Sequence, residues 1–411
     1  MLQITDKDFK LIMGAKASKI YRTVENQGAL NIDEVNIVLD STLQQDVNLF
    51  YIPKHHRRLK IENARINIRY NGENTKNKII LFNNNSRELT VRNCTINFSS
   101  NTQVSFSAIY NYGSLDTPLD TQSDNLLVDS CRIYSTVNAK SIEFANSICG
   151  IENILANSIA LTNNFIFSQT NGVGENQKVF GIINSGRFVR IENNNIKANG
   201  THNVGKQLEQ THCCGVHNTG LYMVFTGNNC VGEWGGKCVG LYNESSYANI
   251  TGNKILATHT ICGRTVKLLG EKNILSNNIL TNTSRNPHIV EILAGENIVS
   301  NNFIQGLLGF NDYKSGCGIF VQGEAQPIKN CIISGNIIAT IRDYGILMIN
   351  TESNIVESNK FLHAQSEEMI SIFHSGKDLI KNEQYKALEK QGTLNDIKPE
   401  NFEHNIISLE S

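Results

Sequence analysis

The sequence is poor in several features that mark common functional classes. It has one tryptophan and only 7% aromatic residues in 411 residues, too few for a platform on which nucleic-acid bases stack. Its formal net charge of -1 argues against a generally basic nucleic-acid-binding protein. It contains no run of about 18 apolar residues, so no membrane span is expected. We therefore expect neither nucleic acid nor a membrane as a partner.

The N-terminus also lacks the basic and then apolar layout of a secretion signal. We expect the protein to be made in the cytoplasm, with the cytoplasm or a virion as its final location. Ten cysteines are present, but Cys/His pairs do not recur at zinc-ligand spacing, so no metal site is expected. The nearest approach to one is residues 211–217, where strand alternation would turn Cys214 and His217 to opposite sides.

What the sequence has in abundance is one repeated phrase, as in "ILSNNIL" (274–280) and "IVSNNFI" (298–304). Branched apolar residues alternate with polar ones at a period of two, which indicates short strands on either side of a tight turn. An irregular period within about 20–50 residues is typical of a solenoid, in which the surplus forms loops. The apolar residues that anchor the phrase are Ile61, Val91, Val128, Leu161, Ile191, Phe225, Ile250, Leu275, Val299, Ile333 and Val356.

The turn of each phrase carries a residue that accepts left-handed backbone, which asparagine and glycine do most readily. In stacked coils about 4.8 Å apart, the asparagine amides at this corner would form a ladder along the stack. The corner residues are Asn63, Asn93, Ser130, Asn163, Asn193, Gly227, Gly252, Asn277, Asn301, Gly335 and Ser358.

A second apolar element lies between the phrases, for example at 179–186, 238–245 and 316–323. Each coil therefore contains about three short strands, which predicts a triangular cross-section. Cysteines recur at fixed places in this pattern, so we expect stacked, free thiols that face inward. They are Cys94 and Cys131 after the corner, and Cys149, Cys214, Cys262 and Cys317 directly before a glycine.

Over roughly residues 31–375 these repeats resemble the right-handed parallel β-helix of the pectin-lyase-like superfamily, without pointing to one member family. The resemblance implies an all-β, single-stranded solenoid of about eleven coils. Residues 1–30 and 376–411 would then be caps, each with a short helix, because an open coil exposes core and unpaired strand edges. The superfamily contains polysaccharide lyases, glycoside hydrolases, epimerases, phage tailspikes and adhesins, so polysaccharide is the implied partner and a homotrimer is compatible.

On the outer face of the second element, one position recurs from coil to coil. The residue that follows the core residue of each strand would face solvent on the same sheet. Four successive coils thus present His217, Tyr242, Lys267 and Glu291, each about 4.8 Å from the next. We take these four as candidate catalytic residues. The whole row is Ile183, His217, Tyr242, Lys267, Glu291, Phe320, Leu347 and Ser371.

The turns that precede this strand carry further charged and aromatic residues. We expect the turns to stand side by side and to wall a groove along the stack, suited to an extended polymer. A lone tryptophan between glycines fits a sugar-stacking platform and local packing equally well. The candidate substrate-binding residues are Glu233, Trp234, Lys237, Arg264 and Asp312.

Three reaction types can be written on these residues: a β-eliminating lyase, a glycoside hydrolase, and an epimerase that would use a similar pair of residues from both faces of the sugar. A β-eliminating lyase would use Tyr242 or His217 as the base and Lys267 or Arg264 to stabilise the developing charge. No residue pattern requires a cofactor, although calcium is compatible with a lyase. A glycoside hydrolase needs two carboxylates about 5–10 Å apart, and Glu291 would supply one of them.

For a hydrolase, Glu233 or Asp312 would be the second carboxylate. The alternative to these enzymes is a non-catalytic glycan-binding or structural β-helix, such as a phage tail component or a surface-polysaccharide assembly protein. In that case the row is a solvated face, and Lys267 and Glu291 form an exposed cross-strand pair that contributes little.

Overall fold

The computed structural model of the chain describes fourteen segments, and the account below concerns these residues. Within them the chain forms only strands and turns, and no helix there is long and apolar enough to cross a membrane. The segments are 2–5, 20–23, 28–29, 34–52, 58–112, 125–139, 145–171, 177–200, 212–284, 287–306, 316–339, 344–362, 370–374 and 377–381.

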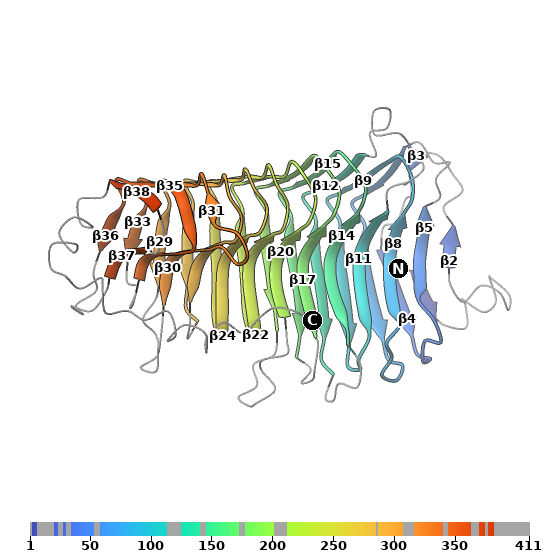
Figure 1. Cartoon of the computed structure of the whole chain (residues 1–411). Coiled ribbons are helices and arrows are strands. Elements are labelled where there is room, and N and C mark those ends of the chain that lie inside the picture. Colours follow the sequence, from blue (N-terminus) through green and yellow to red (C-terminus); the bar gives the residue numbers. More distant parts are fainter. Residues whose placement is uncertain are drawn as a thin grey trace.

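The chain is a parallel β-helix, as expected, in which each coil contributes three strands to three rows. One coil runs through β9 (Glu88–Arg92), β10 (Thr95–Ser100) and β11 (Ser105–Tyr112), and each of these pairs in parallel with the equivalent strand of the next coil. Figure 1 shows the coils stacked in chain order along one axis. We name the rows after these strands: row 1 contains β9, row 2 contains β10 and row 3 contains β11.

Row 1 is a sheet of its own and holds the repeated phrase of the sequence. Its strands are β3 (Gly28–Ala29), β6 (Leu59–Glu62), β9, β12 (Asn125–Asp129), β15 (Ile159–Thr162), β18 (Val189–Glu192), β21 (Val224–Thr226), β23 (Asn249–Thr251), β25 (Ile274–Ser276), β28 (Ile298–Ser300), β32 (Ile332–Ser334), β35 (Thr351–Glu357) and β38 (Lys377–Lys381), with β31 (Ile328–Lys329) also paired to β35.

Rows 2 and 3 count as one sheet because β22 (Asn229–Asn243) and β24 (Lys254–Leu268) run through both. The other strands of row 2 are β1 (Leu2–Thr5), β4 (Glu34–Leu39), β7 (Arg65–Tyr70), β10, β13 (Arg132–Val137), β16 (Phe165–Thr170), β19 (Asn195–Asn199), β26 (Ile279–Asn282), β29 (Phe303–Gly306), β33 (Ile337–Ala339) and β36 (Lys360–Leu362). Those of row 3 are β2 (Ile20–Thr23), β5 (Val47–Ile52), β8 (Lys78–Asn84), β11, β14 (Ser147–Ile154), β17 (Lys178–Asn184), β20 (His212–Asn218), β27 (His288–Ile292), β30 (Cys317–Gln322), β34 (Tyr344–Ile349) and β37 (Ile370–His374).

The anchor residues predicted from the sequence are confirmed as the core of row 1. Each of the eleven lies in its own strand, from Ile61 in β6 to Val356 in β35, with relative exposure of at most 1%. The described strands also extend past both expected limits of the β-helix, residues 31 and 375, since β3 and β38 pair with β6 and β35. The helices expected within the two caps, after Thr5 and near 382–392, lie outside the described residues.

The left-handed corner after row 1 is also confirmed. All eleven predicted corner residues have φ between 53° and 66°. The amide ladder, however, is formed by the residue that follows, which points into the interior while the corner side chain points away. In the ladder each amide Nδ2 donates to the next Oδ1 over 2.9–3.1 Å, through Asn164, Asn194, Asn228, Asn253, Asn278, Asn302, Asn336 and Asn359.

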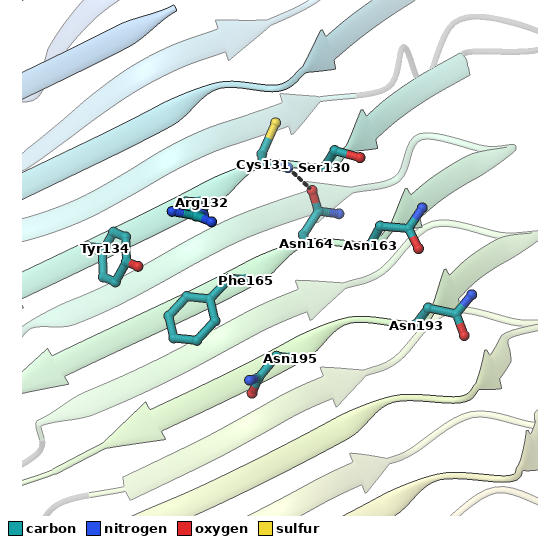
Figure 2. A pocket seen from close by; sticks show the side chains of 9 residues that line it. All are labelled: Ser130, Cys131, Arg132, Tyr134, Asn163, Asn164, Phe165, Asn193 and Asn195. Carbon is teal, nitrogen blue, oxygen red and sulfur yellow. Dashed lines mark hydrogen bonds between the residues drawn. The ribbon is translucent and has the colours of Figure 1, made fainter. Parts of the chain in front are cut away.

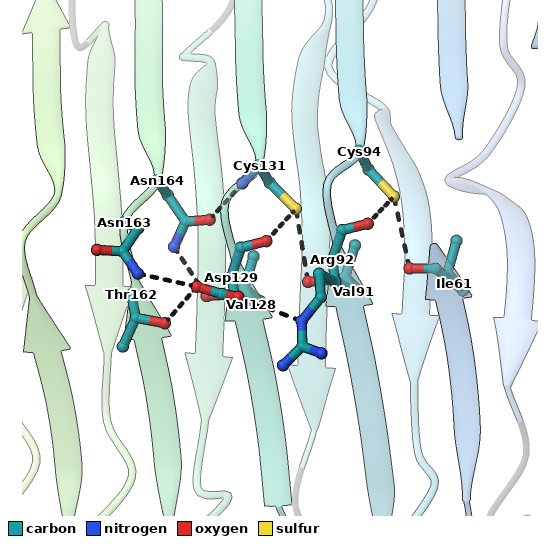
Figure 3. A network of polar contacts seen from close by, with 10 residues as sticks. All are labelled: Ile61, Val91, Arg92, Cys94, Val128, Asp129, Cys131, Thr162, Asn163 and Asn164. Atoms are coloured by element: carbon teal, nitrogen blue, oxygen red, sulfur yellow. Dashed lines mark hydrogen bonds and ion pairs between the residues drawn. The ribbon is translucent and has the colours of Figure 1, made fainter. Parts of the chain in front are cut away.

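Cysteines take over the ladder position in the coils before Asn164. Figure 3 shows the change: the backbone N–H of Cys131 donates to Asn164 Oδ1, and Cys94 lies one coil further back. Both thiols donate to backbone carbonyls and belong to the apolar core. Nine cysteines are free and buried among the described residues, as expected. The side chain of Cys262 is not among those described.

Candidate functional site

The outward row predicted on the second element exists in row 3. Strand pairing aligns it residue by residue from Ile183 through Leu347, in the order expected from the sequence. The last member was wrong: Leu347 pairs with Phe373 and not with Ser371, because β37 starts two residues later than the predicted row assumed. We call this line the His217 column.

A second outward line, the Arg264 column, lies three residues earlier in each strand. Inside β20, both Gly215 and Val216 face the core: a Cβ on Gly215 would lie 2.4 Å from Cys230 Sγ, and Val216 is fully buried in the core. Two consecutive inward residues place Cys214 and His217 on the same outer side, so the expectation of opposite sides was wrong. The column is Cys149, Phe180, Cys214, Val239, Arg264, His288, Cys317 and Tyr344.

This pair of consecutive inward residues, a β-bulge, also changes the orientation expected for three cysteines. Cys317 packs against Phe320 and Leu347 of the His217 column, in a small cluster separate from the main core. Cys149 and Cys214 belong to the column of Cys317 and are likewise absent from the main core. Their expected inward orientation was therefore wrong, although their burial was predicted correctly.

Aromatic rings stack along the middle of the His217 column. The His217 ring lies 4.9 Å from the Tyr242 ring and 5.9 Å from that of Phe180, nearly parallel to both. Glu244 Oε1 lies 2.7 Å from His217 Nε2, so a carboxylate fixes the orientation of the imidazole. Burial and the Glu244 carboxylate raise the pKa of the Tyr242 hydroxyl, which keeps it protonated. Lys267 Nζ continues the line 5.5 Å from the Tyr242 ring centre.

The next two candidates form a buried ion network and not the exposed pair that the alternative required. Arg264 Nε donates to Glu291 Oε2 over 2.7 Å, and Lys267 Nζ lies 3.9 Å from the same oxygen. Lys267 is 5% exposed and Glu291 7%. Burial alone would raise the pKa of the Glu291 carboxyl, but Arg264 and Lys267 hold it below its usual value. Glu291 is thus a stable anion, and burial lowers the pKa of Lys267.

His288, at the start of β27, follows Arg264 in its column. Its ring lies 4.6 Å from the Phe320 ring, and its buried Nδ1 has no hydrogen-bond partner among the described residues. Burial and the neighbouring Arg264 guanidinium lower the pKa of His288 to about 3. The imidazole is therefore neutral at physiological pH.

The remaining substrate-binding candidates are spread over the edge of row 3. Glu233 lies in the row 2 half of β22 and forms an ion pair with Lys197 of β19, so row 2 holds its carboxylate. Trp234 follows at the corner with φ of 52° and is partly buried. Lys237 lies in register with His212 in row 3, and Asp312 lies outside the described residues.

The sequence analysis missed a second charged cluster in the earlier coils of row 3. Lys78 Nζ reaches across two coils to both oxygens of Glu152, over 2.6 and 2.7 Å, and Ser107 Oγ donates to Glu152 Oε1 over 2.6 Å. Glu152 and Tyr110 precede Ile183 in the His217 column. Extending the predicted row backwards by two coils would have found both residues.

A hollow of about 550 Å³ lies away from row 3, at the corner between rows 1 and 2. Figure 2 shows its lining residues, which come from three successive coils. None of the nine candidate site residues predicted from the sequence lines it. The residues that line the hollow are Ser130, Cys131, Arg132, Tyr134, Asn163, Asn164, Phe165, Asn193 and Asn195.

No protein-family model matches the chain, and its sequence matches no curated protein. Among solved structures, the Dettilon tailspike protein is 15% identical over 84% of this chain and 62% of its own, with a TM-score of 0.35. The periplasmic alginate epimerase AlgG is 10% identical over 91% of this chain and 84% of its own, with a TM-score of 0.37. The Streptococcus pneumoniae surface adhesin PfbA is 14% identical over 85% and 92%, with a TM-score of 0.34. At these TM-scores the similarities do not bear on function, and the β-helix architecture follows from the strand pairing itself.

Proposed function

We propose that the protein binds an extended polysaccharide along the outer face of row 3 and acts on it as a lyase. The observation that carries this proposal is the continuous chain of side-chain contacts from Phe180 of the Arg264 column through His217 and Tyr242 to Lys267, which lie in four adjacent coils. Aromatic rings and hydrogen-bonding groups that repeat at coil spacing suit a ligand that itself repeats along one direction.

Charge on the same face favours an acidic polysaccharide. Lys178, His212 and Lys237 lie in register in three successive coils, two residues before the Arg264 column. Neither lysine forms an ion pair with another described residue, and burial together with the two lysine charges lowers the pKa of His212. Uncompensated cations in a line attract a polyanion such as a polyuronate.

The protonation states favour elimination over hydrolysis. A general acid for glycoside hydrolysis needs a raised pKa, whereas Arg264 and Lys267 keep Glu291 ionised. His217, oriented by Glu244, has the chemistry of a general base that removes the proton next to a uronate carboxylate. In this proposal Lys178 and Lys237 bind the carboxylates, while Glu291 positions Arg264 and Lys267.

A non-catalytic glycan-binding protein is the second candidate, and the Glu291 network is the observation that favours it. Arg264 and Lys267 already direct their charge toward one buried carboxylate. A saturated ion network of this kind is more typical of a group that holds its surroundings in place than of one that reacts.

A cleavage assay with matched variants tests the proposal. Polygalacturonate, alginate and a neutral polysaccharide are incubated with the wild type, with His217→Gln and with Tyr51→Phe, and unsaturated ends are followed by ultraviolet absorbance. Tyr51 belongs to the same column but lies five coils before His217, so its variant is the control.

We expect the wild type and Tyr51→Phe to release unsaturated ends from an acidic polymer. His217→Gln should be slower by about 10²-fold or more, the usual contribution of a general base. Binding without cleavage by the wild type would favour the second candidate. Absence of both binding and cleavage across the panel would refute the proposal, as would full activity of His217→Gln.

A further inference from the structure

We propose that the hollow at the corner between rows 1 and 2 is a separate binding site for a carboxylated sugar. It lies on β13, β16 and β19 of row 2 and on the turns that lead into them, so it shares no residue with the columns of row 3. Its volume of about 550 Å³ falls in the usual range of small-ligand sites.

The charge that would bind a carboxylate is the guanidinium of Arg132. This side chain is exposed, lines the hollow and makes no ion pair with another described residue. The nearby carboxylate of Asp129 does not neutralise it, because Asp129 already accepts hydrogen bonds from Arg92, Thr162 and Asn163, as Figure 3 shows. Arg132 therefore has a planar pair of donors available for an incoming anion.

An aromatic pair lies beside this charge. The rings of Tyr134 and Phe165 are 5.3 Å apart and inclined by 36°, and both are partly exposed in the hollow (Figure 2). Phe165 pairs directly with Arg132 in the strand register, so ring and guanidinium are neighbours in adjacent coils. A sugar ring that packs its apolar face on Phe165 would place a carboxylate substituent near Arg132.

The other side of the hollow carries three exposed amides, those of Asn163, Asn193 and Asn195, and of these the Asn163 Nδ2 already donates to Asp129 Oδ1. The buried ladder residues Asn164 and Asn194 satisfy the turn backbone, while the amides of Asn163 and Asn193 are exposed. Asn195, also exposed, contacts Asn229 only through its Oδ1 and keeps its Nδ2 donor available. Exposed amides with unused donors and acceptors suit the hydroxyl groups of a sugar.

The combination of one guanidinium, an aromatic surface and several amides selects the ligand class. A neutral sugar would leave the Arg132 charge without a partner, and a simple anion would leave the Phe165 surface uncovered. A hexuronate residue, free or at the end of a chain, satisfies both, which would give the protein a second glycan contact independent of row 3.

Saturation-transfer NMR with galacturonic acid as the probe, and galactose as its neutral counterpart, tests this inference on the full chain. The variants are Arg132→Gln and Phe165→Ala. The control is Arg65→Gln, since Arg65 is an exposed arginine in the same outward line two coils earlier. Far-ultraviolet circular dichroism verifies that each variant keeps the β-helix.

We expect galacturonic acid to bind the wild type and Arg65→Gln equally. Arg132→Gln should bind it about tenfold or more weakly, since a charge-assisted hydrogen bond pair is lost. Phe165→Ala should lose saturation transfer to the sugar ring protons. Equal binding of galactose and galacturonic acid, or unchanged binding in Arg132→Gln, would overturn the proposal.

Discussion

The neutral His288, half-buried with its Nδ1 fully buried, predicts that the protein loses stability in mild acid. The imidazole begins β27 beside Phe320, with Arg264 before it and Cys317 after it in the same column. The charged groups that act on it are the cations Arg264 and Lys267, which oppose protonation, and Glu291, which favours it. Burial is the largest influence, and the balance lowers its pKa to about 3 from an ordinary value of 6.5.

The size of the effect follows from the difference between these two pKa values. As the pH falls below 6.5, the unfolded chain binds a proton at this residue while the folded chain does not until about pH 3. Stability that is present above pH 6.5 is therefore lost progressively with acidification. At pH 5 the solution is about 1.5 pH units below the ordinary pKa of 6.5. Between pH 7.5 and 5, protonation therefore stabilises the unfolded state relative to the folded state by about 2 kcal/mol.

Denaturant unfolding at pH 7.5 and pH 5 measures this loss. His288→Gln stays neutral throughout, so the wild type should lose about 2 kcal/mol more than the variant between the two pH values. Glu291 does not interfere, because its pKa lies below its ordinary value of 4.5. Parallel pH dependence of the wild type and His288→Gln would refute the reasoning.

Three further substitutions test the packing by denaturant unfolding at pH 7.5. Glu291→Gln should lower the free energy of unfolding by about 3–5 kcal/mol, because it leaves buried cations uncompensated. Adding Lys267→Met should recover part of this loss, and additive effects of the two substitutions would contradict the network. Asn253→Ala should cost about 3 kcal/mol because it leaves buried ladder partners on both sides unsatisfied, and a loss below about 1 kcal/mol would contradict this. Gly215→Ala should cost about 1–3 kcal/mol, since its Cβ would lie 2.4 Å from Cys230 Sγ, and a neutral result would contradict the inward bulge.

The architecture could be predicted from the sequence because stacking imposes the same demand on every coil. Each coil needs an apolar residue inside row 1 and a left-handed corner two residues later, so Val299 and Asn301 recur as types along the chain. The ladder was placed one residue too early for a physical reason. At a left-handed corner the side chain of Asn301 turns outward, and that of Asn302 turns inward and bonds to Asn336.

The candidate site could be predicted only in part. Period-two alternation gave the correct register of the His217 column but could not reveal that Gly215 and Val216 both face inward, because glycine shows no preference for either face. The burial of Lys267 and Glu291 could not be predicted from the sequence either. It depends on Arg264 bending from its own column onto Glu291, a contact between residues 27 positions apart.

The two charged clusters of row 3 together clarify what its outer face offers a ligand. Glu152 is neutralised by Lys78, and Glu291 by Arg264 and Lys267, so these buried carboxylates present little negative charge to a substrate. Between the clusters lie the stacked rings of Phe180, His217 and Tyr242, bordered by Lys178 and Lys237, which form no ion pair with another described residue. Under the proposed function, a face whose buried acids are paired internally would attract an acidic glycan through these two lysines and would present His217 as the base. The sugar proposed at Arg132 carries the same charge, so one acidic polysaccharide would satisfy both surfaces.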